Sequence, residues 1–476
     1  MSSVSALNSL LSSAYPSTTS GIDISSILQA ATGSASTGID VTSAVNAAVT
    51  AAQAPETAWE NQESTLQSQS TALTQIQTDA TNLDNDMQSL NSLTGPLSAT
   101  TVNSSNSSVV TATAASGSAS GTHTVEVNSL ATTASWASGE VASATTALAA
   151  GSFTITGADG TVTTISTGTG TSTLNDVAST INGDNLGVTA SVITDANGAR
   201  LAIVSNTSGQ AANFTVNSAT GGSLSFTQAV TGQNASLSVD GISIASASNT
   251  VTGAVAGVTF DLLNASPGTT VSLTVAPDTS QISTAINQFI TDYNQAITDL
   301  NTQFTFSGTS EGVLATDSDV RSLQSTLESA ISYTATSASG TTTVPNLSSL
   351  GISVNDNGTL TLDSSTLTNA LQNNFNDVQN FFQGPSLNGF ANSLDQQLTT
   401  YISPADGAFT VDLQSISTEY SGLQTDISNF ETNYITPLRT QLQSEYSQAE
   451  IALQQLPTEM QQINTELGLN NNNSNG

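Results

Sequence analysis

The sequence has no cysteine and almost no positive charge. Its 476 residues include three Lys and Arg together, one His and 36 Asp and Glu, which gives a formal net charge of −33. The lack of cysteine excludes disulfide bonds and thiolate chemistry. Nucleic acid and anionic membranes are poor partners, because both are bound through clusters of cations and the only cations are Arg200, Arg321 and Arg439.

Long hydrophobic runs are also missing. No stretch approaches the ~20 apolar residues that cross a bilayer, so we expect no membrane segment. The first residues lack the positive region and the continuous apolar core of an ordinary signal peptide. The lack of cysteine and the abundance of Ser and Thr nevertheless suit an extracellular protein. We therefore expect export by a route other than the general secretory one.

Residue types that build active sites and metal centres are scarce. His123 is the only histidine, so a zinc site or a Ser-His-Asp triad has almost no ligands available. It lies in an alternating segment, and we interpret it as a half-buried strand residue. Asp84 with Asp86, and Asp317 with Asp319, are two residues apart and do not share a helix face, which indicates a solvated helix surface or a cap. The sequence predicts no enzyme activity, no cofactor and no metal.

Helical patterns occupy both ends of the chain and strand patterns occupy the middle. Residues 40–93, and the chain from Thr279 onward, show apolar side chains at helical spacing, with Asp40 placed to cap the first helix. Residues 100–278 alternate as strands. This order predicts an α+β multidomain fold. Terminal helices form a coiled-coil or helical-bundle leg, and all-β or α+β domains are nested in the middle.

Turn residues locate the strands more closely. Asp-Gly and Asn-Gly dipeptides favour tight hairpins, and they occur at Asp159-Gly160, Asn197-Gly198, Asp240-Gly241 and Asn357-Gly358. Residues 257–277 read as a final pair of strands, broken at Pro267-Gly268. Residues 172–182 have helical spacing instead, and further helices are predicted at about 314–333, 364–382, 388–402 and from about 409.

The most regular pattern is a coiled-coil seam near the end of the chain. From residue 442 to 467, apolar side chains recur in alternating steps of four and three, and a similar heptad runs through residues 59–90. Pro457 interrupts the terminal segment, and the apolar phase shifts near Pro437, which predicts a stutter or a break. The candidate assembly seam consists of Trp59, Leu66, Leu73, Ile76, Leu83, Met87, Leu442, Tyr446, Leu453, Leu456, Met460, Ile463 and Leu467.

These patterns predict nested domains. The expected parts are a mobile N-terminal segment 1–40 that pairs with 440–476, a helical leg of 41–100 plus 279–439 with a small hairpin near 350–363, a β-rich head of 101–135 plus 232–278, and an inserted β-rich tip of 136–231. Apolar residues such as Ile22, Ile24, Ile27 and Leu28 could pack on the terminal seam. They are too few to bury it, so we also expect contacts with other chains.

Several of these segments, in this order, resemble the bacterial flagellar filament capping protein, the hook-associated protein 2 family. The similarity is carried by "GIDVTSAVNAAVTAAQAPETAWENQES", by "VSLTVAPDTSQISTAINQFITDYNQAITDL", by "LSSLGISVNDNGTLTLDSSTLTNALQNNFNDVQNFF" and by the terminal coiled coil. Between them, "TLNDVASTINGDNLGVTASVITDANGARLAIVS" is similar to an insertion motif of flagellins and hook-associated proteins. The resemblance covers most of the chain.

The resemblance implies a function and partners. Such proteins are exported unfolded by the flagellar type III system and form a ring, typically a pentamer, at the distal tip of the filament. The ring promotes folding and insertion of exported flagellin and prevents its loss. The implied partners are further copies of this chain, flagellin, hook-filament junction proteins and a flagellar export chaperone. The implied location is extracellular.

Two other readings stay open at this stage. One is another flagellar axial protein, namely a hook-filament junction protein or a minor flagellin. The other is a secreted adhesin whose β-domains bind glycans, which would support cell adhesion rather than motility. An adhesin would lose binding, but not filament growth, when residues 136–231 are removed.

The charge composition generates a solubility prediction. The chain has a pI near 4.1, so its intermolecular repulsion disappears only in acid. We expect self-association or precipitation near pH 4, measured as turbidity during a titration from pH 7. A turbidity that stays flat down to pH 4 would contradict this expectation.

Overall fold

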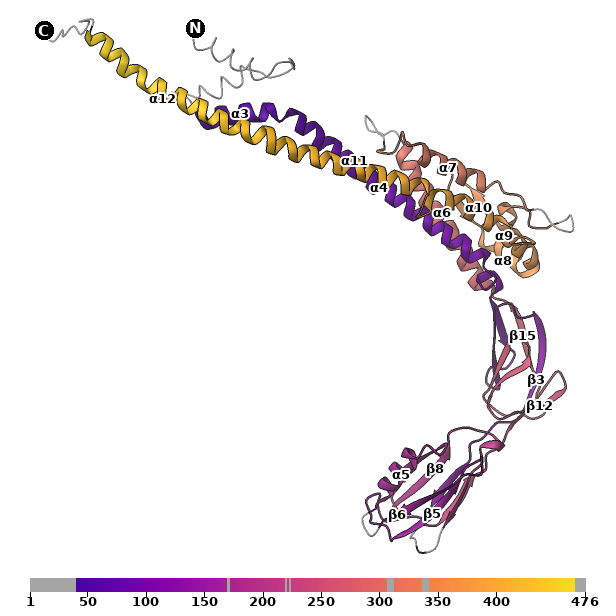
Figure 1. The fold of residues 1–476 in the computed structure, drawn as a ribbon. Helices are drawn as coiled ribbons and strands as arrows, with labels where there is room; N and C mark the ends of the chain where they lie inside the picture. The colour runs from indigo at the N-terminus through magenta and orange to yellow at the C-terminus, as the bar shows by residue number, and fades with distance from the viewer. Residues whose placement is uncertain are drawn as a thin grey trace, which may run out of the picture. The chain divides into compact units, whose positions relative to one another are not determined.

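The computed structural model describes residues 40–168, 172–218, 221, 224–305, 312–335 and 342–466 (Figure 1). The predicted fold class is confirmed, because helices occupy both ends and several sheets occupy the middle. The chain divides into two compact units. One takes in the described residues up to Thr81, Gln295–Leu327 and the chain from Gln397 on, and the other takes in Asn82–Asn294 and Glu328–Gln396.

The first unit is helical. Asp40 caps its first helix as predicted, since the Asp40 carboxylate accepts a hydrogen bond from the Ser43 N–H at 3.0 Å. The predicted break near Pro437 is confirmed as a π-helical turn, which inserts a residue into the helix repeat. The elements are α3 (Val41–Ala52), α4 (Ala54–Asn91) as far as Thr81, α7 (Ser318–Ala330) as far as Leu327, α11 (Ala408–Phe430), the π turn η4 (Glu431–Ile435) and α12 (Thr436–Glu466).

The second unit contributes a cluster of aromatic side chains. Phe381, Phe382 and Phe390 are fully buried and their rings contact one another at centroid distances of 5.1–6.0 Å. The helix expected over 364–382 is two helices that separate at Asn374. The elements are α6 (Thr279–Phe304), η3 (Leu347–Leu350), the hairpin of β16 (Ile352–Val354) and β17 (Leu360–Leu362), α8 (Ser364–Asn373), α9 (Phe375–Gln383) and α10 (Phe390–Ile402).

One β-sandwich follows the short turn η1 (Pro96–Ser98). Its sheets have the orders β1-β15-β3-β11-β12 and β13-β14-β2, and alternate residues of β11 and β14 point into the shared core. The strands are β1 (Thr100–Ser104), β2 (Val110–Ala114), β3 (Gly121–Ser129), β11 (Ala235–Val239), β12 (Ile242–Ser246), β13 (Thr250–Val255), β14 (Val258–Leu262) and β15 (Val271–Pro277).

The final strand pair predicted over 257–277 is wrong. Both segments are strands, but β14 pairs with β13 and β2, whereas β15 pairs with β1 and β3 in the other sheet. The connection around Pro267-Gly268 crosses from one sheet to the other. Sequence alternation fixes which side of a strand is buried, and it does not identify the neighbouring strand.

A second β-rich part lies between β3 and β11 in the sequence and has its own core. It contains two antiparallel sheets of orders β10-β4-β8-β7 and β6-β5-β9, with α5 packed against β7 (Figure 1). The predicted hairpins and the helix over 172–182 are confirmed here. The elements are β4 (Ser135–Ser138), β5 (Gly151–Thr156), β6 (Val162–Thr167), α5 (Leu174–Gly183), β7 (Val188–Thr194), β8 (Ala199–Ser205), η2 (Gln210–Ala212), β9 (Thr215–Ser218) and β10 (Phe226–Val230).

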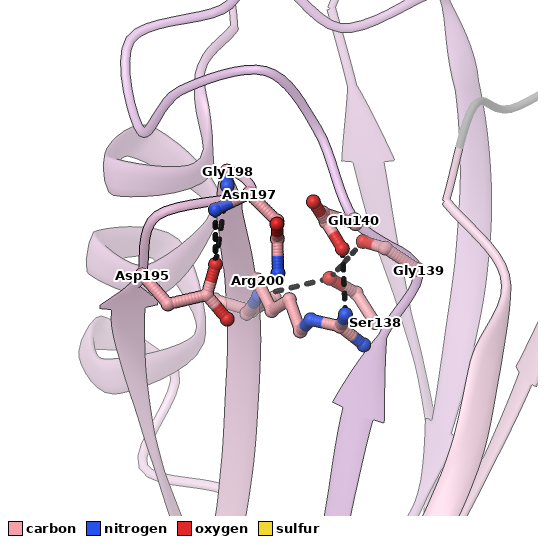
Figure 2. Close-up of polar contacts among 8 residues, drawn as sticks. Ser138, Gly139, Glu140, Asp195, Asn197, Gly198 and Arg200 are labelled. Carbon is pink, nitrogen blue, oxygen red and sulfur yellow. Dashed lines mark hydrogen bonds and ion pairs between the residues drawn. The ribbon is translucent and has the colours of Figure 1, made fainter.

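A polar network holds the β7–β8 turn against the segment that follows β4. Arg200 donates to the Glu140 carboxylate at 2.6 Å, and Figure 2 shows the two side chains directed at each other. The Asp195 carboxylate accepts the N–H groups of Asn197 and Gly198 within the turn. Gly198 is required because a Cβ there would lie 2.3 Å from the Val141 carbonyl oxygen.

The packing of α4 generates a stability prediction. Leu83 is completely buried, whereas Leu93, just past the end of the same helix, is 68% exposed. Leu83→Ala should lower the free energy of unfolding by about 2–5 kcal/mol because it leaves a cavity, as measured by urea denaturation. The control Leu93→Ala should change it by less than about 0.5 kcal/mol. Equal effects at both positions would contradict the packing described here.

Candidate functional site: an apolar face on the terminal helix

The first part of α12 has a partner within the chain. Helix α3 packs on it antiparallel, as shown by the Gln53–Glu431 hydrogen bond of 2.8 Å and the Asn46–Arg439 contact of 3.4 Å. Figure 1 shows α3 lying along α12, and together the two helices bury a small apolar core. This core consists of Ala44, Val45, Val49, Ala52, Ile435 and Tyr446, with Val41, Phe430, Leu438 and Leu442 partly buried against it.

Among the described residues, none covers the later part of α12 in this way. Every residue from Ile451 to Ile463 is exposed, although the helix continues through Pro457 to Glu466. The seam side chains Leu453, Leu456, Met460 and Ile463 are 42%, 47%, 61% and 53% exposed. We name these four residues the terminal face. A row of large apolar side chains in water is unfavourable, since fully burying one such side chain is worth about 1.5–3 kcal/mol.

The seam residues of α4 are placed differently. Leu66, Leu73, Ile76, Leu83 and Met87 are buried within the chain. Trp59 is partly exposed, and its ring meets Phe430 edge-on at a centroid distance of 5.4 Å. The structure therefore separates twelve of the thirteen candidate residues into an inner set and the outward terminal face. Leu467, like the N-terminal residues Ile22, Ile24, Ile27 and Leu28, lies outside the described residues.

The cations of the chain are engaged elsewhere. Arg439, on α12, lies near Asn46 of α3, and Arg200 pairs with Glu140. Arg321 donates to the Ala315 carbonyl and lies over the Phe304 ring at 4.7 Å. The terminal face is flanked by Gln, Thr and Glu residues without Lys or Arg. A partner that fits this face must make apolar contacts and uncharged hydrogen bonds.

His123 has a partner that sequence reasoning did not find. Its Nδ1 lies 2.8 Å from the Asp240 carboxylate, and Asp240 adopts a left-handed conformation with φ of 51°. The hydrogen bond with His123, followed by one from the Thr124 N–H, lowers the pKa of Asp240. Asp240 was recognised only as a turn residue, because a contact across 117 positions leaves no local signal. The His123 side chain is 24% exposed, consistent with a half-buried strand residue.

The sequence predicted that two aspartate pairs lie on a solvated helix surface or in a cap. This prediction is correct for Asp317 with Asp319 and wrong for Asp84 with Asp86. Asp317 caps α7 by accepting the N–H groups of Asp319 and Val320. Asp84, by contrast, is only 6% exposed, so it is not part of a solvated surface. Its position two residues from Asp86 on the helix does not prevent burial, because α4 contacts other helices on more than one side.

The described residues also bear on metal binding and membrane insertion. No group of three or more His, Cys, Asp or Glu in this part of the chain is arranged to hold a metal ion. The described helices include none with the length and apolarity needed to cross a bilayer. The terminal face is therefore the most distinctive candidate site in the part of the chain that the structure describes.

Comparisons with known proteins agree on one family. A model described as the flagellar hook-associated protein 2 C-terminus matches residues 232–461, and one described as the N-terminus of the same protein matches residues 37–134. A flagellin hook IN motif matches residues 152–207 between them. The two rivals, an axial protein of another kind and an adhesin, are not favoured by these matches.

Individual relatives point the same way. A B-type flagellar hook-associated protein 2 of Pseudomonas aeruginosa is 29% identical over 218 residues, which is 40% of this chain and just under half, 46%, of that relative. The crystal structure of the flagellar cap protein FliD D1-D2-D3 domains from Escherichia coli has 26% identity and a TM-score of 0.56. The match between the two covers 73% of this chain and 99% of the Escherichia coli chain. Because both terminal models of one protein match in the right order, the chain belongs to the flagellar hook-associated protein 2 family.

Proposed function

We propose that this protein caps the distal tip of a bacterial flagellar filament, where it forms a ring and promotes the folding and insertion of exported flagellin. Family membership supports this role, and so does the likeness to the Escherichia coli cap protein over nearly all of that chain. The ring prevents flagellin from escaping into the medium. The location is extracellular, reached by the flagellar type III system.

The observation that carries the proposal is the uncovered terminal face. Leu453, Leu456, Met460 and Ile463 keep the heptad spacing of a coiled coil and are all exposed. Helices of this length are marginal in water without tertiary contacts, because most of their stability comes from packing an apolar face. The face is therefore suited to ordering against another helix during assembly.

We propose that the partners of this face are supplied both by the chain itself and by its neighbours. We propose that residues 1–40 pair with 440–476, as predicted from the sequence. The antiparallel contacts of Asn46 with Arg439 and of Gln53 with Glu431 support this pairing. Further copies of the chain and the terminal helices of flagellin would complete the burial.

The remaining parts have supporting roles in this proposal. The helices of residues 41–100 and 279–439 act as the leg that contacts the filament, and the β-rich parts 101–135 plus 232–278 and 136–231 form the plate. A flagellar export chaperone binds the terminal helix before export. The hook-filament junction proteins are further partners of the cap. The apolar and uncharged character of the terminal face suits these helix-to-helix contacts.

Charged substitutions on the terminal face test its role in assembly. The double variant Leu456→Asp, Met460→Asp should weaken self-association at least tenfold, because burying two unpaired carboxylates is unfavourable. Light scattering of the purified protein measures the oligomer mass. The matched control is Thr458→Asp, Thr465→Asp, which adds the same charge on the opposite side of α12 and should leave the mass unchanged. An intact oligomer in the first variant would rule out this face as the contact.

Deletion of the gene tests the cap function itself. Unpolymerised flagellin should accumulate in the culture medium and filaments should be short or absent, as measured by immunoblotting and electron microscopy. The full-length chain should restore filaments, and the Leu456→Asp, Met460→Asp chain should not. Normal filaments in the deletion strain would exclude a cap. A chain without residues 136–231 that still supports filaments, but no longer binds a glycan surface, would indicate an adhesive tip.

A further inference from the structure

Three carboxyl groups of α4 each have one buried oxygen that receives no hydrogen bond from the described residues. Glu56 is 7% exposed and Asp84 is 6% exposed. Glu56 Oε2, Asp84 Oδ1 and Asp86 Oδ2 are buried oxygens without a hydrogen-bond partner among the described residues. A buried charge without compensation is strongly unfavourable. Such a carboxyl group is therefore stabilised by a ligand that supplies a hydrogen-bond donor.

The groups that face these carboxyls are themselves carboxyls. In the second unit, Asp84 of α4 is within hydrogen-bond reach of Asp395 of α10, and Asp86 is within reach of Asp292 of α6. Burial first, and the neighbouring carboxyl second, raise the pKa of Asp84 to about 6 and the pKa of Asp86 to about 7. The one neighbour that acts oppositely is Gln88, which donates to Asp84 Oδ2 at 2.8 Å.

The first unit repeats the arrangement. Burial raises the pKa of Glu56, and the charges of Glu431 in the π turn and of Glu60 raise it further, against a hydrogen bond with Gln53. On α11, burial and then the charges of Asp317 and Asp319 from α7 raise the pKa of Asp412 to about 6.

No cation relieves these groups. Arg321 of α7 is directed to the Ala315 carbonyl and the Phe304 ring, and Arg439 of α12 is directed to Asn46. Neither guanidinium contributes to the pKa of Glu56 or of Asp412.

A proton is the ligand that fits such a pair. Two ionised carboxylates offer only acceptors, but one added proton creates an O–H that donates to the other oxygen and removes the repulsion. Each pair joins two different helical elements: α4 with α10, α4 with α6, α4 with the π turn, and α11 with α7. Protonation therefore strengthens contacts between helices.

We propose that the interhelical carboxyl pairs Asp84–Asp395, Asp86–Asp292, Glu56–Glu431 and Asp412–Asp319 act as proton-operated clamps, which hold the helices more tightly in mild acid than at neutral pH. This property belongs to the isolated chain and does not depend on the proposed cap function. It provides a means of keeping the helical parts easier to unfold at neutral pH than in an acidic medium.

The direction of the pH effect follows from proton linkage. In the unfolded chain these groups ionise near their ordinary pKa of about 4, whereas in the folded chain Asp84, Asp86 and Asp412 ionise near 6 to 7. The folded state therefore takes up protons first as the pH falls. The stabilisation is complete below about pH 4 and is lost as the pH rises through 6 to 7. Exposed caps such as Asp40 have a lowered pKa and oppose the effect only below about pH 4.

Urea denaturation of the full chain, followed by the helical circular dichroism signal, tests the clamps. The wild-type midpoint should be higher at pH 5.0 than at pH 7.5. Asp84→Asn, Asp86→Asn should raise the midpoint at pH 7.5, because each amide donates to the facing carboxylate as the protonated acid does. In this variant, the difference between the urea midpoints at pH 5.0 and pH 7.5 should be at most half of the wild-type difference. Midpoints that do not change with protein concentration exclude a contribution from self-association.

The matched control removes a charge without removing a pair. Asp426 is exposed on α11, so Asp426→Asn should keep the wild-type difference between the two pH values. The facing variant Asp292→Asn, Asp395→Asn alters the other member of each pair and should reproduce the flattened profile if the first variant folds poorly. A wild-type midpoint that is equal or lower at pH 5.0, or a facing variant with the wild-type difference, would overturn the proposal.

Discussion

Antiparallel packing between the two ends of the chain organises the helical part of this protein. Helices α3 and α4 lie along α11 and α12, and the contacts run in register from Gln53–Glu431 through Gln62–Glu419 to Gln77–Thr410. Most of these polar contacts use a Gln donor, because the chain has almost no Lys or Arg. In the sequence, the β-rich parts lie between the N-terminal and C-terminal helical segments that pack on each other.

The shortage of cations has consequences both inside and outside the chain. On the surface, it leaves acidic and uncharged side chains, so contacts with other molecules depend on apolar faces such as Leu453, Leu456, Met460 and Ile463. Inside, it leaves buried carboxyls such as Asp84 and Asp86 facing other carboxyls, where most proteins would place Arg or Lys. The same compositional feature thus connects the assembly surface to the pH response of the helices.

Membership of the hook-associated protein 2 family gives these features a common setting. A cap subunit must pass between a free state and an assembled state, and an amphipathic helix that is uncovered in one chain suits that transition. We propose that the terminal face supplies the contact and that the clamps set how firmly the helices hold together. The two act at different places in the chain, so one can be altered without the other.

The sequence by itself determined the order of helical and β-rich regions, the hairpins at Asp159-Gly160, Asn197-Gly198, Asp240-Gly241 and Asn357-Gly358, and the Asp40 cap, because each depends on neighbouring residues. Heptad spacing also located the seams, but it did not distinguish Leu83 from Met460, because both are seam positions. Only the tertiary structure showed that Leu83 is buried and Met460 is exposed, that β14 and β15 belong to different sheets, and that Asp84 faces Asp395. Periodicity records which side of an element is apolar, whereas the partner of that side is set by contacts between residues far apart in the chain.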